Sequence, residues 1–257
     1  MKYSRRQFLV RGAQVIGGSL AASLLARFSL AETALAQGSQ EKPNWPLYWQ
    51  EHAWVLVVDV GRCLGCGRCV RACKEENGVP LDREVYRTWV ERYGIRADGQ
   101  VTVTSPEGGL EGFPPPRDGE IRAFFVPKLC NQCAKPPCVK VCPVAATYRT
   151  GDGVILVDQQ RCIGCRYCIQ ACPYGARFLH PVLSVADKCT WCYHRIVKGL
   201  LPACVQVCPT GARIFGDLKK PESPAARILA TQPTSVLKPA MGTEPMVHYL
   251  GLDGVVI

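Results

Sequence analysis

All sixteen cysteines of this 257-residue sequence fall into four groups of four. Each group begins with two cysteines separated by two residues and ends with two cysteines separated by three residues. The groups are Cys63, Cys66, Cys69 and Cys73; Cys130, Cys133, Cys138 and Cys142; Cys162, Cys165, Cys168 and Cys172; and Cys189, Cys192, Cys204 and Cys208. Closely spaced thiols form disulfides or bind metals and iron–sulfur clusters. The chemistry of this chain is therefore expected at its cysteines.

The spacing is that of the bacterial ferredoxin run, C-x2-C-x2-C-x3-C followed by proline. Three cysteines on one tight loop can face three corners of an iron–sulfur cube, and the fourth lies on a short helix and ligates a neighbouring cluster. Pro143, Pro173 and Pro209 follow groups two, three and four, whereas group one continues as "CKEENGVP". We expect four [4Fe-4S] clusters with all sixteen cysteines as ligands.

Other uses of cysteine fit this spacing less well. Two cysteines three positions apart rarely suit a disulfide. Zinc sites with four cysteine ligands usually pair two separated C-x-x-C knuckles, whereas a third cysteine follows at once in groups one and three. Covalent haem needs C-x-x-C-H, and no C-x-x-C pair here precedes histidine. Haem is excluded, and a zinc- or disulfide-stabilised extracytoplasmic interaction module with no redox role remains the alternative.

The chain also repeats itself outside the cysteines. "CPVAATY", "CPYGARF" and "CPTGARI" follow groups two, three and four, and strand-like runs such as "WVLVVDVGRC" and "VILVDQQRC" precede groups one and three. Each unit therefore consists of a strand, a cluster loop, a short helix and a turn. We expect an α+β fold of two tandem ferredoxin-like modules with two clusters each and loop-rich surroundings. The cluster motifs occupy 63–73, 130–142, 162–172 and 189–208.

Two further segments accompany the motifs. Residues 78–127 contain three alternating, strand-like runs and predict a small β insert that covers the inner clusters or contacts a partner. Residues 217–257 form a C-terminal extension, in which Ser223 and Pro224 predict the start of a helix. The apolar tail is too short to span a bilayer, so we expect it to pack on its own domain.

The N-terminus has the features of an export signal. Arg5 and Arg6 precede an apolar stretch, as in twin-arginine signals, and residues 34–36 read Ala-Leu-Ala, a cleavage site. We expect a signal peptide over 1–36, a mature domain over 37–257 and a periplasmic or other extracytoplasmic location. An uncleaved anchor is the alternative. The twin-arginine resemblance implies transport of a folded, cofactor-loaded protein.

The net charge and the lack of nucleotide-binding motifs limit the classes of function that the sequence allows. The formal charge is +10, of which residues 1–36 contribute +4. Four oxidised clusters with their thiolates add about −2 each, so the mature protein is near neutral and its charge does not indicate nucleic-acid binding. The sequence lacks G-x-G-x-x-G and P-loop motifs, which argues against a nucleotide or substrate site of its own. Lys188, Trp191 and Arg195 flank group four and either tune its cluster or serve packing.

Over about residues 52–218, these motifs resemble the four-cluster ferredoxin-type electron-transfer subunits of bacterial respiratory complexes. That family includes the β subunits of polysulfide, tetrathionate and dimethyl sulfoxide reductases, the iron–sulfur subunit of formate-dependent nitrite reduction, and relatives in the sulfite-reduction-associated complex. The resemblance implies that this chain is an electron-transfer subunit rather than an enzyme. It also implies two partners: an integral membrane subunit that interacts with quinone, and a catalytic subunit of the molybdopterin or multihaem cytochrome type.

The resemblance further implies how the groups share clusters, which the spacing alone leaves open. In the family, the last cysteine of each group joins the first three cysteines of another group. The implied sets are Cys63, Cys66 and Cys69 with Cys208; Cys189, Cys192 and Cys204 with Cys73; Cys130, Cys133 and Cys138 with Cys172; and Cys162, Cys165 and Cys168 with Cys142.

Overall fold

The computed structural model describes residues 45–116 and 118–256. The predicted signal peptide, residues 1–36, lies outside this part, as does the predicted start of the mature domain. The chain divides into two compact units, Met1–Trp45 and Pro46–Ile257, and all cysteines belong to the second. Within the described ranges, no helix is both long and apolar enough to cross a membrane.

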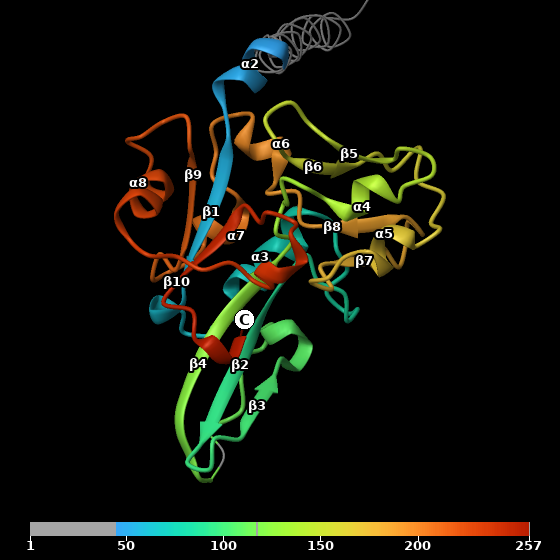
Figure 1. The fold of residues 1–257 in the computed structure, drawn as a ribbon. Coiled ribbons are helices and arrows are strands. Elements are labelled where there is room, and N and C mark those ends of the chain that lie inside the picture. Colours follow the sequence, from blue (N-terminus) through green and yellow to red (C-terminus); the bar gives the residue numbers. More distant parts are fainter. Residues whose placement is uncertain (1–44, 117, 257) are drawn as a thin grey trace, which may run out of the picture. The chain divides into compact units, whose positions relative to one another are not determined.

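The second unit combines short helices with short strands (Figure 1). Its helices are α2 (Trp45–Glu51, whose first residue belongs to the first unit), α3 (Arg68–Glu76), α4 (Pro137–Lys140), α5 (Tyr167–Gln170), α6 (Tyr193–Ile196), α7 (Ala203–Gln206) and α8 (Pro224–Thr231). Its strands are β1 (Trp54–Asp59), β2 (Thr88–Arg96), β3 (Val101–Thr104), β4 (Glu120–Leu129), β5 (Thr147–Arg149), β6 (Ile155–Val157), β7 (Arg177–Leu179), β8 (Ala186–Lys188), β9 (Arg213–Asp217) and β10 (Val247–Leu250).

Three strand pairings join the cysteine groups to one another. β5 pairs antiparallel with β6 and thereby links groups two and three, and β7 pairs antiparallel with β8 and links groups three and four. β1 pairs antiparallel with β9, so the strand before group one lies beside the strand after group four. The first and last cysteine groups of the sequence are therefore neighbours in space.

The hydrophobic core is centred on β1. Its run of Val and Leu residues is completely buried, and alternate side chains face opposite sides, as in any strand. Leu56 and Val58 pack in the main core, whereas Val55 and Val57 pack against α8. Because both faces are covered, β1 forms a fixed support for the loop of group one that follows it.

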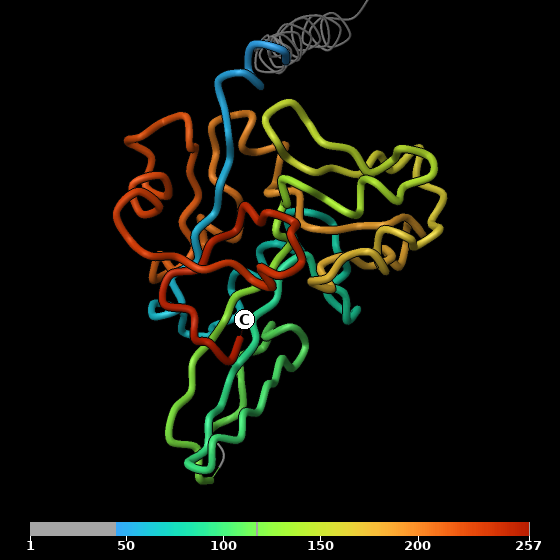
Figure 2. Tube along the Cα trace, in the orientation of Figure 1, coloured from blue at the N-terminus to red at the C-terminus, as the bar shows by residue number. Residues whose placement is uncertain are grey.

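The C-terminal extension folds back onto this core. Ser223 caps α8, since its hydroxyl accepts from the Ala226 N–H, and Pro224 is the first helical residue, so the predicted helix start is confirmed. β10 then pairs in parallel with β1. After β10, the chain returns toward the strands of residues 88–129, as Figure 2 shows, and Asp253 forms an ion pair with Arg122 on β4.

Strands β3, β2 and β4 form a separate antiparallel sheet within the region predicted as a β insert. β2 and β4 extend away from the short helices as a long antiparallel pair (Figure 1). At the base of this sheet, Val90 and Leu110 pack in one apolar cluster with Cys69 and Cys204, and Phe125 packs against that cluster. The insert therefore covers cysteines of groups one and four.

Candidate iron–sulfur sites

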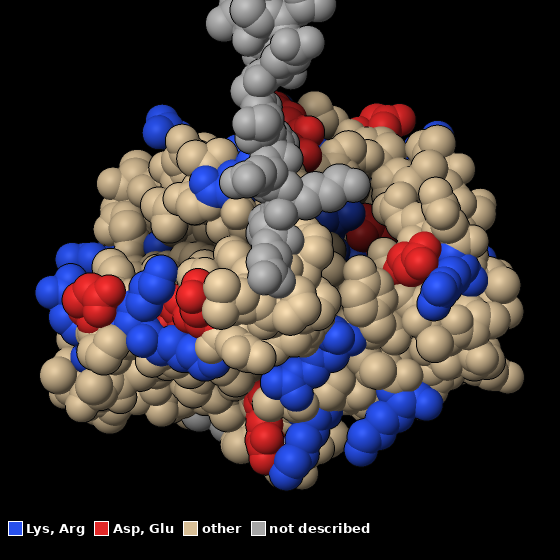
Figure 3. Space-filling view, turned by 90° about the horizontal axis from the view of Figure 1, so that it is seen from above, with Lys and Arg blue, Asp and Glu red and all other residues tan. Residues whose placement is uncertain are grey.

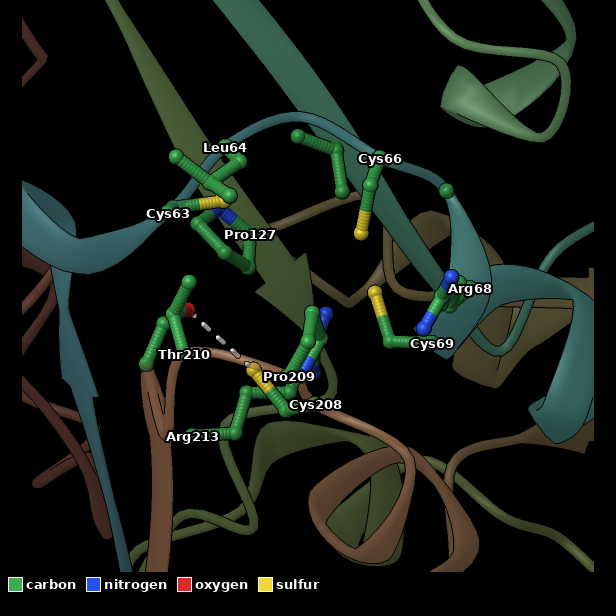
Figure 4. Close-up of a pocket in the computed structure, with 13 residues that line it drawn as sticks. Cys63, Leu64, Cys66, Arg68, Cys69, Pro127, Cys208, Pro209, Thr210 and Arg213 are labelled. Atoms are coloured by element: carbon green, nitrogen blue, oxygen red, sulfur yellow. Dashed lines mark hydrogen bonds between the residues drawn. The ribbon is translucent and has the colours of Figure 1, made fainter.

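The first site contains the thiols of Cys63, Cys66, Cys69 and Cys208. All four face one cavity, as Figure 4 shows. The loop approaches the β insert so closely that a side chain at Gly67 would collide with the Gly109 carbonyl, and Gly67 has a φ of +70°. Glycine is required there for both reasons.

The second site contains Cys73, Cys189, Cys192 and Cys204, and all four are buried. The Asn77 side chain bridges two of them, since its Nδ2 lies 3.6 Å from Cys73 Sγ and 3.7 Å from Cys192 Sγ. Burial raises the pKa of Cys73 well above its usual value, and the negative charges of the other three thiolates raise it further. A bound metal cluster removes this penalty, because metal ligation stabilises the thiolate form.

The third site contains Cys130, Cys133, Cys138 and Cys172, which line one cavity. Its wall also includes Asn131, Ile155, Tyr174 and Arg177. Burial is the main cause that raises the pKa of Cys133 to about 12, and the Thr243 hydroxyl opposes this rise.

The fourth site brings Cys142 beside Cys162, Cys165 and Cys168, whose thiolate charges act on one another. Backbone amides support two of these sulfurs: the Thr147 N–H donates to Cys142 Sγ at 3.4 Å, and the Ala186 N–H donates to Cys162 Sγ at 3.3 Å. Burial alone would raise the pKa of Cys142, but hydrogen bonds from the backbone amides of Thr147, Val144 and Ala146 lower it overall.

The sites have the membership that the nested pairing predicted, while ligation itself stays a prediction. The short helices explain this arrangement. Cys69 and Cys73 lie one helical turn apart on α3, so one faces the first site and the other the second. In the same way, Cys204 on α7 belongs to the second site, and Cys208, just after the helix, belongs to the first. Helices α4 and α5 contact each other and have the same role for the third and fourth sites: each carries a cysteine of one of these two sites, and the cysteine just after the helix belongs to the other site.

Cysteines of different sites pack together in a consecutive order. Cys69 of the first site and Cys204 of the second share one apolar cluster. Cys138 of the third site and Cys168 of the fourth share another. Between the two modules, Cys189 of the second site and Cys130 of the third lie in the central core, and their charges interact. The sites therefore follow one another as first, second, third and fourth.

The two ends of this series reach the surface. Cys66 in the first site and Cys165 in the fourth are exposed, whereas every cysteine of the second site is buried. Leu64 and Ile163, which lie between the first two cysteines of their groups, are 64% and 65% exposed. Apolar side chains at such exposure mark the surface next to each terminal site.

Comparisons with known proteins fit these sites. Residues 121–218 match a family described as a 4Fe-4S dicluster domain, and residues 62–146 match a second family of the same description. The tetrathionate reductase B subunit of Salmonella typhimurium is 40% identical over 256 residues, which cover 98% of this chain and 90% of the relative. Its counterpart from Archaeoglobus fulgidus is 46% identical over 221 residues, covering 86% and 92%. The polysulfide reductase B polypeptide of Wolinella succinogenes is 40% identical over 191 residues, covering 74% and 90%.

The chain belongs to the family of ferredoxin-type iron–sulfur subunits of oxidoreductase complexes. Its cofactors follow from that membership. Two dicluster domains correspond to four [4Fe-4S] clusters, and the number of cysteines, sixteen, fits four ligands for each cluster. All sixteen thiols are unpaired in the structure. The two 4Fe-4S dicluster domains, rather than the unpaired thiols, exclude the alternative of a zinc- or disulfide-stabilised module.

Buried polar atoms around the sites also fit a sulfur-rich cofactor. Buried N–H donors without a protein partner are rare in folded proteins. In the described part of this iron–sulfur subunit, such donors include Asn131 Nδ2, Arg177 Nε, Trp191 Nε1 and Arg213 Nη1. Asn131 and Arg177 line the third site, and Arg213 lines the first. Cluster and thiolate sulfurs are the acceptors that these donors require.

Some of these functional residues do not stand out in the sequence. Arg177 and Arg213 are buried beside thiols, whereas the sequence points only to Lys188, Trp191 and Arg195. A signal was present, since the repeated "GAR" places both arginines five residues after the last cysteine of their groups. Arg195, by contrast, forms an ion pair with Glu76 at 2.7 Å.

Proposed function

We propose that this subunit relays single electrons between an integral membrane subunit that reacts with quinone and a catalytic redox subunit of the molybdopterin or cytochrome type. The relatives support this role, because their names place them in tetrathionate and polysulfide reductases. When bound, the clusters supply reversible one-electron chemistry. The protein's own part is to order the four sites, exclude water from the inner ones and leave both ends open to partners.

The observation that carries this proposal is the exposure of only the terminal sites. Among the cysteines, Cys66 and Cys165 are exposed, and they belong to opposite ends of the series. A protein that merely stored clusters would need neither a consecutive order nor two open ends. A relay needs both, since electrons enter at one surface and leave at another.

The two ends offer different surfaces. Beside the first site, Leu64 is accompanied by the exposed arginines Arg62 and Arg68. Beside the fourth site, Ile163 is accompanied by the exposed arginines Arg161 and Arg166 and also by the exposed side chains of Tyr167 and Val182. Both ends therefore carry two exposed arginines, and the fourth-site end adds exposed apolar surface, which suits two different partners rather than two copies of one.

The proposal includes an extracytoplasmic location. Arg5 and Arg6 support it, because a twin-arginine signal exports proteins that have folded and taken up cofactors. The face in Figure 3 carries positive and negative side chains interspersed, as is usual for a soluble surface. With no long apolar helix among the described residues, we place the membrane attachment in a partner subunit.

Anaerobic purification from membranes, followed by identification of co-purifying subunits, tests the proposal. We expect a brown protein with about sixteen irons per chain, together with a membrane subunit and a catalytic subunit. Recovery as a lone soluble monomer would contradict the role in a complex. For the location, replacing Arg5 and Arg6 by lysine is expected to leave the iron-loaded protein in the cytoplasm, whereas Lys2→Arg changes nothing.

A further inference from the structure

Four buried cations in the described part of the protein have no carboxylate within ion-pair distance. One of them, Lys74, donates instead to the carbonyl oxygens of Pro80 and Arg83. The other three lie beside thiols of the sites. Arg213 is 2% exposed, Arg177 is 4% exposed and Lys188 is 0% exposed. Other buried arginines are neutralised by carboxylates, as in the pair of Arg87 with Asp187 at 2.8 Å. A buried charge without a counter-charge costs several kcal/mol. These three side chains must therefore face negative charge of another kind.

Arg213 lies at the junction of the first and second sites. It lines the cavity of the first site (Figure 4), and the thiolate charge of Cys69 is the strongest influence that raises the pKa of Arg213, against the effect of burial. Cys69 packs in one cluster with Cys204 of the second site. Burial raises the pKa of Cys204 to about 11, and the Arg213 guanidinium opposes this rise most strongly. Its positive charge therefore acts on both sites.

Lys188 lies at the junction of the second and third sites. Its Nζ donates to the carbonyl oxygen of Cys189, a second-site cysteine, at 2.8 Å. The same Nζ donates to the carbonyl oxygen of Ile155, which lines the third site. Burial lowers the pKa of Lys188, and the thiolate of Cys130 in the third site counteracts this most strongly. The ammonium group thus connects the two modules.

Arg177 lies at the junction of the third and fourth sites. It lines the third cavity and donates to the Thr147 hydroxyl, and the Thr147 N–H in turn donates to Cys142 of the fourth site. Burial raises the pKa values of Cys138 and Cys168, and Arg177 is the foremost group that opposes both rises. Cys138 belongs to the third site and Cys168 to the fourth, so the positive charge of Arg177 acts on both sites.

We propose that Arg213, Lys188 and Arg177 are charge-compensating residues, one at each junction of the relay, and that each raises the reduction potentials of the clusters on both of its sides. The inference rests on the proposed function, because it assigns these residues to the junctions that electrons cross. Each oxidised cluster with its thiolates carries about −2, and reduction adds one more negative charge. A fixed buried cation stabilises the added electron at either neighbour, and the side chain itself gains and loses no electron.

EPR-monitored redox titration of the anaerobically purified protein tests this pattern. Arg213→Met is expected to lower the potentials of the first and second clusters, Lys188→Met those of the second and third, and Arg177→Met those of the third and fourth. Each affected reduction equilibrium should shift roughly tenfold, or about 59 mV for one electron. Signals are assigned with cysteine-to-serine variants at each site, namely Cys66, Cys192, Cys133 and Cys165.

Arg161→Met is the matched control. Arg161 precedes the first cysteine of its group as Lys188 does, but it is exposed and pairs with Asp158. Its removal should change no potential as much as the buried substitutions do. Arg213→Lys and Arg177→Lys keep the charge and should keep the potentials closer to the parent values. If a methionine variant loses iron, the glutamine variant at the same position is titrated instead.

The outcomes separate this inference from the relay itself. Paired shifts in adjacent clusters support the assignment. Shifts in one cluster only, or shifts no larger than that of Arg161→Met in iron-replete protein, overturn it. If the parent protein contains no iron, the proposed electron-transfer function is wrong as well. Iron analysis detects this outcome without any measurement of reduction potentials.

Discussion

Arg177 and Thr147 occupy the same position of the repeated unit and hydrogen-bond to each other. Each lies five residues after the last cysteine of its group, and both terminal N–H groups of Arg177 donate to Thr147 Oγ1, at 3.3 and 3.2 Å. The second unit of the repeat has threonine where the third has arginine. One guanidinium therefore contacts the segments that follow both groups.

Thr147→Val should lower the free energy of unfolding by about 1–3 kcal/mol. The hydroxyl is buried, and its loss leaves two N–H groups of buried Arg177 without this acceptor. Denaturant titration that follows cluster absorbance measures the change. Thr231→Val, at an exposed position near the end of α8, is the control and should have little effect. Equal stability of both variants would show that the bond contributes nothing.

Cys172→Ser should alter the cluster of the third site, although Cys172 belongs to the third group of the sequence. Its thiol lines the cavity with Cys130, Cys133 and Cys138. Its EPR spectrum and redox titration should therefore resemble those of Cys133→Ser. A closer match to Cys165→Ser, which affects the fourth site, would disprove the sharing of helices between sites.

His248 should make stability depend on pH. Burial on β10 lowers its folded pKa below the usual value of 6.5, so the unfolded chain binds the proton more readily. Its contribution to stability is present above the unfolded pKa and is lost as the pH falls from about 6.5 toward the folded pKa. The midpoint temperature should fall more between pH 7.5 and 5.5 in the parent than in His248→Asn. Parallel decreases in both proteins would contradict this assignment.

Leu64→Glu and Ile163→Glu should each slow electron exchange with one partner at least tenfold, because a charge at a desolvated contact costs more than about 1.4 kcal/mol. Both side chains are exposed beside a terminal site, so iron content should stay unchanged. Val103→Glu, also exposed but on β3 of the insert, is the control. The measurement is the rate of cluster reduction and reoxidation in the assembled complex. Unchanged rates in both variants would remove these ends as docking points.

The cysteines show how much of the site can be predicted from the sequence. Their spacing alone predicted the clusters, because cluster ligation demands tight loops that few other sites share. It could not give the set membership, because partners such as Cys63 and Cys208 are distant in sequence and meet only through the β1–β9 pairing. Family resemblance supplied that step.

The sequence predicts those parts of the fold that depend only on interactions between adjacent residues. Ser223 and Pro224 predicted the start of α8, because capping is a property of adjacent residues. The parallel pairing of β10 with β1 was not predictable, since nothing near residue 247 encodes its distant neighbour. The same limit hid the junction role of Arg177 and Arg213. Burial beside two sites arises only when both modules have folded.

The neighbouring positions of groups one and four also determine the order in which the nascent chain can mature. The third and fourth sites take all their cysteines from residues 130–172, so they can close while the C-terminal part is still on the ribosome. The first and second sites require Cys208 and Cys204, which emerge much later. We predict that a chain truncated before Cys204 would load only the third and fourth sites. A loaded first site would then indicate that synthesis has passed residue 208.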